Sequence, residues 1–170
     1  MAVIPGRRSA AIAKAATSIA PLSGRKAVIQ VCFVTGDIDK SARWFAGLLG
    51  QPVPKFAVSG PRAEAETEYL GAPSDARCTM AFFKLDNLEI ELIQPDEHPS
   101  CWRDFLERNG PGVHHIAFEV AGMKQKIAAF GEAGLPLLQK GEFEGGRYAY
   151  VDTEPQMGIL LELLEFDNRH

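Results

Sequence analysis

The chain has 170 residues, of which 46% are hydrophobic and 24% are charged, as is ordinary for a globular protein. A formal net charge of −4, with no basic stripe and interleaved aromatic residues, argues against a nucleic-acid partner. Since no apolar run approaches the ~18–20 residues that span a bilayer, we also expect no membrane contact.

The cysteines are Cys32, Cys78 and Cys101, an odd number without C-x-x-C spacing. This pattern argues against a disulfide framework and against a zinc site built from thiolates. A chain with free thiols suits a reducing compartment, so we expect a cytoplasmic location.

Residues 1–27 differ in composition from the rest of the chain. They are rich in Ala, Ser and basic residues, and the first carboxylate of the chain is Asp37. Such a composition is typical of an organellar transit peptide. A short helix over about Ser9–Ile19 that packs on the domain or on a partner subunit fits it as well.

Residues 28–170 are expected to form one domain with an internal duplication. The β-prone run Ile29–Val34 matches His114–Glu119, and Leu88–Asp96 matches Ile159–Asp167. The first run of each pair begins a module and the second run ends it. The modules therefore span residues 28–96 and 113–167.

A helical pattern follows the first strand of each module. The first helix is expected over Ile38–Leu49, with Asp37 as N-cap and Gly50 as the stop. The second is expected over about Met123–Ala133, and a linking helix over Ser100–Asn109.

Between helix and last strand, each module has room for further strands, bounded by turn residues. Candidates are Glu64–Leu70, Cys78–Leu85 and Arg147–Asp152. Each module is thus read as strand, helix and three strands, a βαβββ unit. The fold class is α+β, with two tandem βαβββ modules that form a curved mixed sheet around a metal pocket.

The duplication places four polar residues at equivalent positions: Gln30 matches His115, and Glu91 matches Glu162. Each lies in an otherwise apolar strand, where an unpaired polar group would cost several kcal/mol if it were buried. A shared divalent cation would satisfy all four side chains. Zn²⁺, Mn²⁺, Co²⁺, Ni²⁺ and Fe²⁺ suit such oxygen and imidazole donors, and the sequence does not distinguish them.

Strand alternation refines this ligand set, because neighbouring side chains point to opposite faces of a sheet. His114 and His115 should therefore point apart, and the repeat selects His115 as the ligand. Leu161 and Leu163 should face the helices, opposite to Glu162. Taken singly, each of the four residues also fits a hydrogen-bonded core or a solvated strand face.

Three segments carry a family resemblance: Gln30–Asp37, Gly112–Val120 and the Leu-Leu-Glu-Leu run around Glu162. They resemble the vicinal-oxygen-chelate superfamily, which includes glyoxalase I, methylmalonyl-CoA epimerase, extradiol dioxygenases and bleomycin-resistance proteins. The resemblance covers about residues 28–166. It implies a glyoxalase-like fold, a small-molecule substrate, a divalent metal and commonly a homodimer.

Two members of that superfamily are the most similar. The stretch from Glu91 through Trp102 to His115 resembles methylmalonyl-CoA epimerase, which usually has His at the position of Gln30 and Gln at that of Glu91. The set Gln, Glu, His, Glu resembles eukaryotic glyoxalase I instead. Both resemblances imply a metal-dependent isomerase, epimerase or lyase that acts through a metal-stabilised enolate of a small carbonyl substrate.

Two carboxylates are candidates for the acid and base. The glyoxalase resemblance implies that Glu162 exchanges between ligand and base, and the epimerase resemblance implies a catalytic role for Glu68, with Glu66 as a substitute. Glu64, Glu66 and Glu68 also fit the solvated face of an edge strand.

Five further residues are candidates for substrate binding. Arg77 and Arg147, and with them Arg103, could anchor a carboxylate or phosphate, although each also fits an ordinary surface cation. Tyr148, together with Tyr150 on the same strand face, could line the pocket or belong to the core. A metal-dependent dioxygenase-type enzyme and a non-catalytic small-molecule or drug-binding protein remain alternatives.

Overall fold

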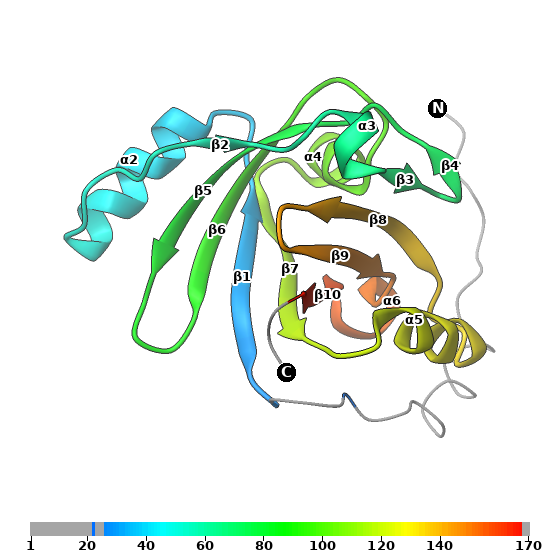
Figure 1. Ribbon diagram of the computed structural model, residues 1–170. Helices are drawn as coiled ribbons and strands as arrows, with labels where there is room; N and C mark the ends of the chain where they lie inside the picture. The colour runs from blue at the N-terminus through cyan, green and yellow to red at the C-terminus, as the bar shows by residue number, and fades with distance from the viewer. Residues whose placement is uncertain (1–21, 23–25, 168–170) are drawn as a thin grey trace.

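The computed structural model describes residue 22 and residues 26–167. Its ten strands form one strongly curved sheet in the order β2-β5-β6-β1-β7-β10-β9-β8-β3-β4 (Figure 1). This mixed, curled sheet with a few helices confirms the α+β, glyoxalase-like fold class. The extension at residues 1–27 lies almost entirely outside the described residues, as does the proposed helix within it.

The first module supplies one half of the sheet. Its main strands are β1 (Val28–Val34), β5 (Cys78–Lys84) and β6 (Glu89–Pro95), with the short β2 (Ala57–Val58) at the edge. Helix α2 (Ile38–Leu49) has the expected bounds, because Asp37 accepts a hydrogen bond from the Lys40 backbone N–H and Gly50 ends it in the left-handed conformation.

The second module repeats this plan. Its strands are β7 (Gly112–Glu119), β8 (Leu137–Phe143), β9 (Gly146–Val151) and β10 (Leu160–Phe166), and its helices are α5 (Met123–Glu132) and the short α6 (Glu154–Met157). Between the modules, Ser100 caps the linking helix α4 (Cys101–Asn109). Read outward from the central β1–β7 pair, both halves continue with a parallel strand and then an antiparallel one.

The strand register agrees with the duplication residue by residue. Across β1 and β7, Gln30 pairs with Ala117 and Cys32 with His115, as a twofold that exchanges Gln30 with His115 requires. Cys32 also pairs with Glu91 on β6, while Ala117 pairs with Glu162 on β10. The same twofold therefore exchanges Glu91 with Glu162.

One segment departs from the expected βαβββ pattern. The expected strand Glu64–Leu70 is wrong in part: residues Arg62–Ala65 form a helical turn, α3, and only Glu68–Tyr69 form a strand, β3. Strand β3 pairs with β4 (Ala72–Pro73) and with β8 of the other module. The β3–β4 hairpin of the first module therefore lies beside β8 and extends the second module's half of the sheet.

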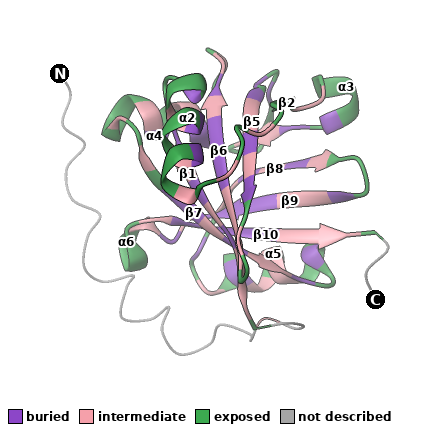
Figure 2. Ribbon diagram, turned by 90° about the vertical axis from the view of Figure 1, so that its left-hand side faces the viewer, coloured by how far each residue is buried: buried purple, intermediate pink, exposed green. Residues whose placement is uncertain are grey.

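Helices α2 and α5 cover the convex side of the sheet, whereas Trp102 of α4 lines the cavity on the concave side. Helix α2 packs its buried face on β5 and β6 through a cluster that includes Ala42, Phe83 and Leu92. Helix α5 packs on β8, β9 and β10, where Leu161 and Leu163 point toward it as expected. Figure 2 shows the contrast between the exposed outer face of α2 and the buried strands beneath it. The concave side carries the polar residues of the site together with an apolar cluster that includes Trp102 and Tyr150.

Replacing Leu163 by Ala is expected to lower the free energy of unfolding by about 2–5 kcal/mol, because the side chain is fully buried between the sheet and α5. Leu48→Ala is the control, since Leu48 is 64% exposed on α2 and should change stability by about 0.5 kcal/mol or less. Urea unfolding of both variants measures the difference, and equal costs would contradict the assigned packing.

Candidate metal centre

The four residues of the duplicated pattern meet on the concave side of the sheet. Gln30, Glu91, His115 and Glu162 come from β1, β6, β7 and β10, the four central strands, and each is at most 7% exposed. The ring Nε2 of His115 lies 3.1 Å from Glu162 Oε2 and 3.4 Å from Glu91 Oε2. Glu91 and Glu162, 71 positions apart along the chain (162 − 91), therefore lie beside the same imidazole.

These donor atoms face one another but form no hydrogen bond of regular geometry. Within the described part of the chain, the buried side-chain atoms without a hydrogen bond are Glu91 Oε2, His115 Nε2, Glu162 Oε2 and His114 Nε2. Buried polar atoms are normally hydrogen-bonded, and exceptions call for an explanation such as an ion. Three of the four atoms belong to the expected ligand set, so the residues present fit a divalent cation.

Charge is concentrated at this point. Burial alone would lower the pKa of His115, but the carboxylates of Glu162 and Glu91 outweigh burial and raise it to about 9. Burial likewise raises the pKa of Glu91 against the opposing effect of His115. A proton on His115 thus supplies the positive charge in the metal-free protein, in the place that a cation would take.

His114 and His115 do not point apart, which corrects the expectation from strand alternation. The register shifts between Cys32 and Phe33, which pair with His115 and Val113, so His114 is the extra residue of a β-bulge. The two rings are in contact, with 2.9 Å between their Nδ1 atoms. This hydrogen bond leaves His115 Nε2 directed at the carboxylates.

Cys32 also lies at the site, although it was not among the ligands predicted from the sequence. Its Sγ, a Glu91 oxygen and a His115 nitrogen all lie within 4.8 Å of one another. Burial, followed by Glu91, raises the pKa of this thiol well above its usual value. The signal was present in the sequence, because Cys32 is two residues after Gln30 in a strand and shares its face.

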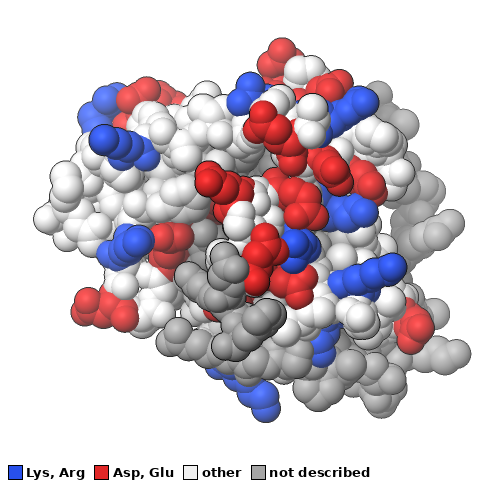
Figure 3. All heavy atoms as spheres, viewed as in Figure 1, with Lys and Arg blue, Asp and Glu red and all other residues white. Residues whose placement is uncertain are grey.

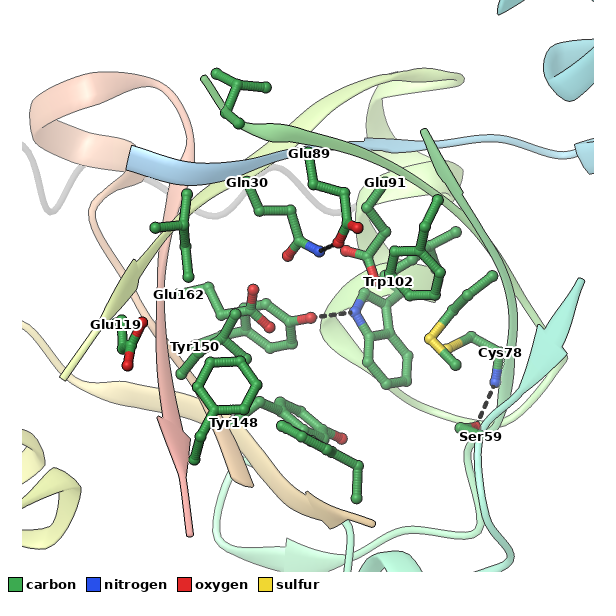
Figure 4. Close-up of a pocket in the computed structure, with 18 of the residues that line it drawn as sticks. Gln30, Ser59, Cys78, Glu89, Glu91, Trp102, Glu119, Tyr148, Tyr150 and Glu162 are labelled. Carbon is green, nitrogen blue, oxygen red and sulfur yellow. Dashed lines mark hydrogen bonds between the residues drawn. The ribbon is translucent and has the colours of Figure 1, made fainter. Parts of the chain in front are cut away.

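A cavity of about 640 Å³ is lined by Gln30, Glu91 and Glu162, whereas His115 and Cys32 are not among its lining residues. Figure 4 shows Gln30, Glu89 and Glu91 on one side of it and Glu162 on the other, with Tyr148, Tyr150 and Trp102 along its wall. The Gln30 amide donates to Glu89, and Trp102 Nε1–H donates to the Tyr150 hydroxyl. Glu89, which shares the face of Glu91, is a further carboxylate of the cavity and was not among the predicted site residues.

Of the residues predicted to act in catalysis or to bind substrate, some line the cavity and others lie outside its lining. Tyr148 and Tyr150 line the cavity, whereas Glu68, Arg77, Arg103 and Arg147 are not among the lining residues. Glu68 lies 3.3 Å from Lys140 on the neighbouring strand β8. A catalytic role for Glu68 and anchoring roles for the arginines stay predictions.

The fold and the site agree with a match to a known family. The model of the glyoxalase/bleomycin resistance protein/dioxygenase superfamily matches residues 29–151, and the chain belongs to this superfamily. Among curated relatives, an ethylmalonyl-CoA/methylmalonyl-CoA epimerase of Cereibacter sphaeroides is 33% identical over 102 residues, which cover 55% of this chain and 76% of the relative. An uncharacterized protein of Bacillus subtilis, YqjC, is 29% identical over 94 residues, 54% of this chain and 67% of that one.

Solved structures show the same fold. The methylmalonyl-CoA epimerase of Mycobacterium tuberculosis has a TM-score of 0.55 and 21% identity, with 88% of this chain and 91% of that chain covered. A variant of the Streptomyces coelicolor methylmalonyl-CoA epimerase in complex with 2-nitronate-propionyl-CoA has a TM-score of 0.58 and 19% identity, with 87% of this chain and 97% of that chain covered.

Across residues 26–167, no helix has the length and apolar character to cross a membrane.

Proposed function

We propose that the chain is a metal-dependent epimerase or isomerase of a small carbonyl compound. The observation that carries this proposal is the convergence of Glu91, His115 and Glu162 with unpartnered buried donor atoms. The wall of the cavity contains the Gln30 side chain beside Glu91 and Glu162, and we propose that Gln30 completes the ligand set. The epimerase relative supports the same class of reaction.

A divalent ion in this place would supply a Lewis acid that stabilises negative charge on a carbonyl oxygen. The residues themselves provide the proton transfer. Glu162 Oε2 has no hydrogen-bond partner and its side chain faces the cavity, so we propose that Glu162 takes the proton from the carbon next to the carbonyl. Return of a proton to the opposite face of that carbon inverts it, and return to the neighbouring carbon isomerises the compound.

Tyr150 and the aromatic wall complete the proposed site. The Tyr150 hydroxyl accepts the hydrogen bond of Trp102, which leaves its own hydrogen to donate to a polar group in the cavity. Burial, with further contributions from Glu162 and Glu91, raises the pKa of Tyr150 well above its usual value. Tyr150 therefore stays a neutral hydrogen-bond donor.

Solvent deuterium exchange tests the proposed function. The metal-loaded protein is incubated in D₂O with small ketones, hydroxyketones, N-acetylcysteamine thioesters and CoA thioesters, and deuterium at the α-carbon is followed by NMR. We expect exchange with at least one class, and its loss after chelation. Exchange that survives complete metal removal would contradict metal dependence. Oxygen uptake with bound iron, or tight binding of these compounds without exchange, would favour a dioxygenase or a binding protein, respectively.

The expected homodimer and the cytoplasmic location stay part of this proposal. Sedimentation equilibrium of the full chain measures the former, and imaging of a tagged chain in its own cell measures the latter.

A further inference from the structure

Cys32 lies directly between two of the proposed metal ligands. On β1 it pairs with Glu91 of β6 on one side and with His115 of β7 on the other. Residues paired across neighbouring strands point to the same face of a sheet. The Cys32 Sγ, a carboxylate oxygen of Glu91 and a ring nitrogen of His115 accordingly lie within 4.8 Å of one another. The sulfur atom is therefore close enough to share an ion with both residues.

The thiol lies on the side of the site that faces away from the cavity. Gln30, Glu91 and Glu162 line the cavity, whereas Cys32 and His115 are 0% exposed and are not among its lining residues. A compound in the cavity would thus approach an ion from the carboxylate side. The sulfur and the imidazole would hold the same ion from the interior of the protein.

Two neighbours of the thiol point to an ion independently of the thiol itself. Glu91 Oε2 and His115 Nε2 are buried and form no hydrogen bond of regular geometry within the described part of the chain, which is rare for buried polar atoms. The Cys32 thiol also interacts with the Glu91 carboxylate. An ion at this point would contact all three side chains.

The other cysteines show what a purely apolar role is like. Cys78 and Cys101 are buried in the same apolar cluster as Cys32, where a free cysteine packs as a small hydrophobic residue. Among the residues that the structure describes, neither of them belongs to a group of potential metal ligands, and Cys32 does. Burial in the core therefore accounts for Cys78 and Cys101 but not for the position of Cys32 between a carboxylate and an imidazole.

We propose that Cys32 is a ligand of the ion, beside Glu91, His115 and Glu162. This inference rests on the proposed function and narrows the class of metal at the same site. The ion replaces the hydrogen of the thiol, the released proton passes to solvent, and no electron is transferred. Since a thiolate is a soft donor, it favours Zn²⁺ over Mn²⁺. A single thiolate among oxygen and nitrogen donors is a different site from the all-thiolate zinc site that the cysteine spacing argues against.

A measurement that detects sulfur next to the metal tests this proposal. Metal content alone is not sufficient, because exposed carboxylates also bind divalent ions, and Figure 3 shows Asp and Glu side chains gathered over the middle of one face of the molecule. X-ray absorption at the zinc edge of the full chain, loaded with one equivalent of Zn²⁺, gives the distances to the bound atoms. We expect a sulfur atom at about 2.3 Å beside nitrogen and oxygen atoms at about 2.0–2.2 Å.

Two matched variants assign the sulfur. Cys32→Ser keeps the size of the side chain and removes the sulfur, so the sulfur signal should disappear. The affinity for Zn²⁺ should fall by at least about 10–100-fold, the range for groups that only support a metal ligand, and the affinity for Mn²⁺ should change less. Cys101→Ser is the control, because Cys101 is buried in the same cluster but lies outside the cavity lining and the ligand group. It should keep both the sulfur signal and the affinity.

The cobalt spectrum of the unaltered chain provides a test that needs no variant. Co²⁺ bound to a thiolate has a near-ultraviolet charge-transfer band, and we expect this band in the wild-type chain. A bound ion without the band, zinc surrounded by nitrogen and oxygen alone, or a sulfur signal that persists in Cys32→Ser would overturn the proposal and leave the proposed reaction intact. A chain that binds no ion would overturn the proposed metal-dependent function as well, so the two failures are distinguishable.

Discussion

Replacing Glu162 by Gln is expected to lower the rate of α-proton exchange by about 10²–10⁴-fold, the usual contribution of a positioned general base. The amide keeps the size of the side chain but cannot take up the proton. Glu162 is 4% exposed, and its side chain lines the cavity. Exchange is measured by NMR with metal content determined on the same sample, because a loss of metal would also lower the rate.

Glu68→Gln is the informative comparison for this result. Glu68 is also a predicted catalytic carboxylate, yet its side chain is 42% exposed and pairs with Lys140. We expect a much smaller loss of exchange than in Glu162→Gln. A loss of similar size with metal retained would instead support a catalytic role for Glu68, through a movement that brings the β3–β4 hairpin over the cavity.

The second large effect is expected in thermal stability. A ligand that binds only the folded chain at ~1,000 times its Kd adds about 4 kcal/mol to the free energy of unfolding. For a chain of this length each kcal/mol shifts Tm by about 2–4 °C, so a bound ion should raise Tm by roughly 8–16 °C. The physical cause is local: the cation would take the place of the His115 proton beside Glu91 and Glu162, and would bind buried oxygen and nitrogen atoms that form no hydrogen bond within the described part of the chain.

Calorimetry with added Zn²⁺, Co²⁺, Mn²⁺ or Ni²⁺, and again with chelator, measures this shift. His115→Ala should abolish it, since the imidazole lies between both carboxylates. Asp96→Ala is a control that removes a carboxylate paired with the half-buried His98, outside the lining of the cavity. An equal shift in wild type and His115→Ala would mean that the ions bind elsewhere.

The sequence was sufficient to predict the duplicated architecture. A repeat of two modules within one chain preserves the register of equivalent strands. This is why Gln30 could be matched with His115 and Glu91 with Glu162, and the strand pairs Cys32–His115 and Cys32–Glu91 agree with that match. The helix α2 was predictable to its ends, since the Asp37 side chain and the glycine after Leu49 determine both termini locally.

Other features depend on contacts that no local pattern encodes. The pairing of Glu68 with Lys140 joins a hairpin of the first module to β8 of the second, a partner chosen by tertiary packing. The bulge at His114 shifts side-chain direction by one residue, and strict alternation could not predict it. The engagement of Arg147 by three carboxylates likewise follows from strands brought together by folding.

Metal content of the full chain tests the central claim most directly. The protein is purified without chelator, dialysed against each of Zn²⁺, Mn²⁺, Co²⁺ and Ni²⁺, and measured by elemental analysis beside Glu162→Ala and His115→Ala. The convergence of Gln30, Glu91, His115 and Glu162 predicts about one ion per wild-type chain and none in either variant. A wild-type chain that takes up none of these ions, or variants that retain a full complement, would contradict it.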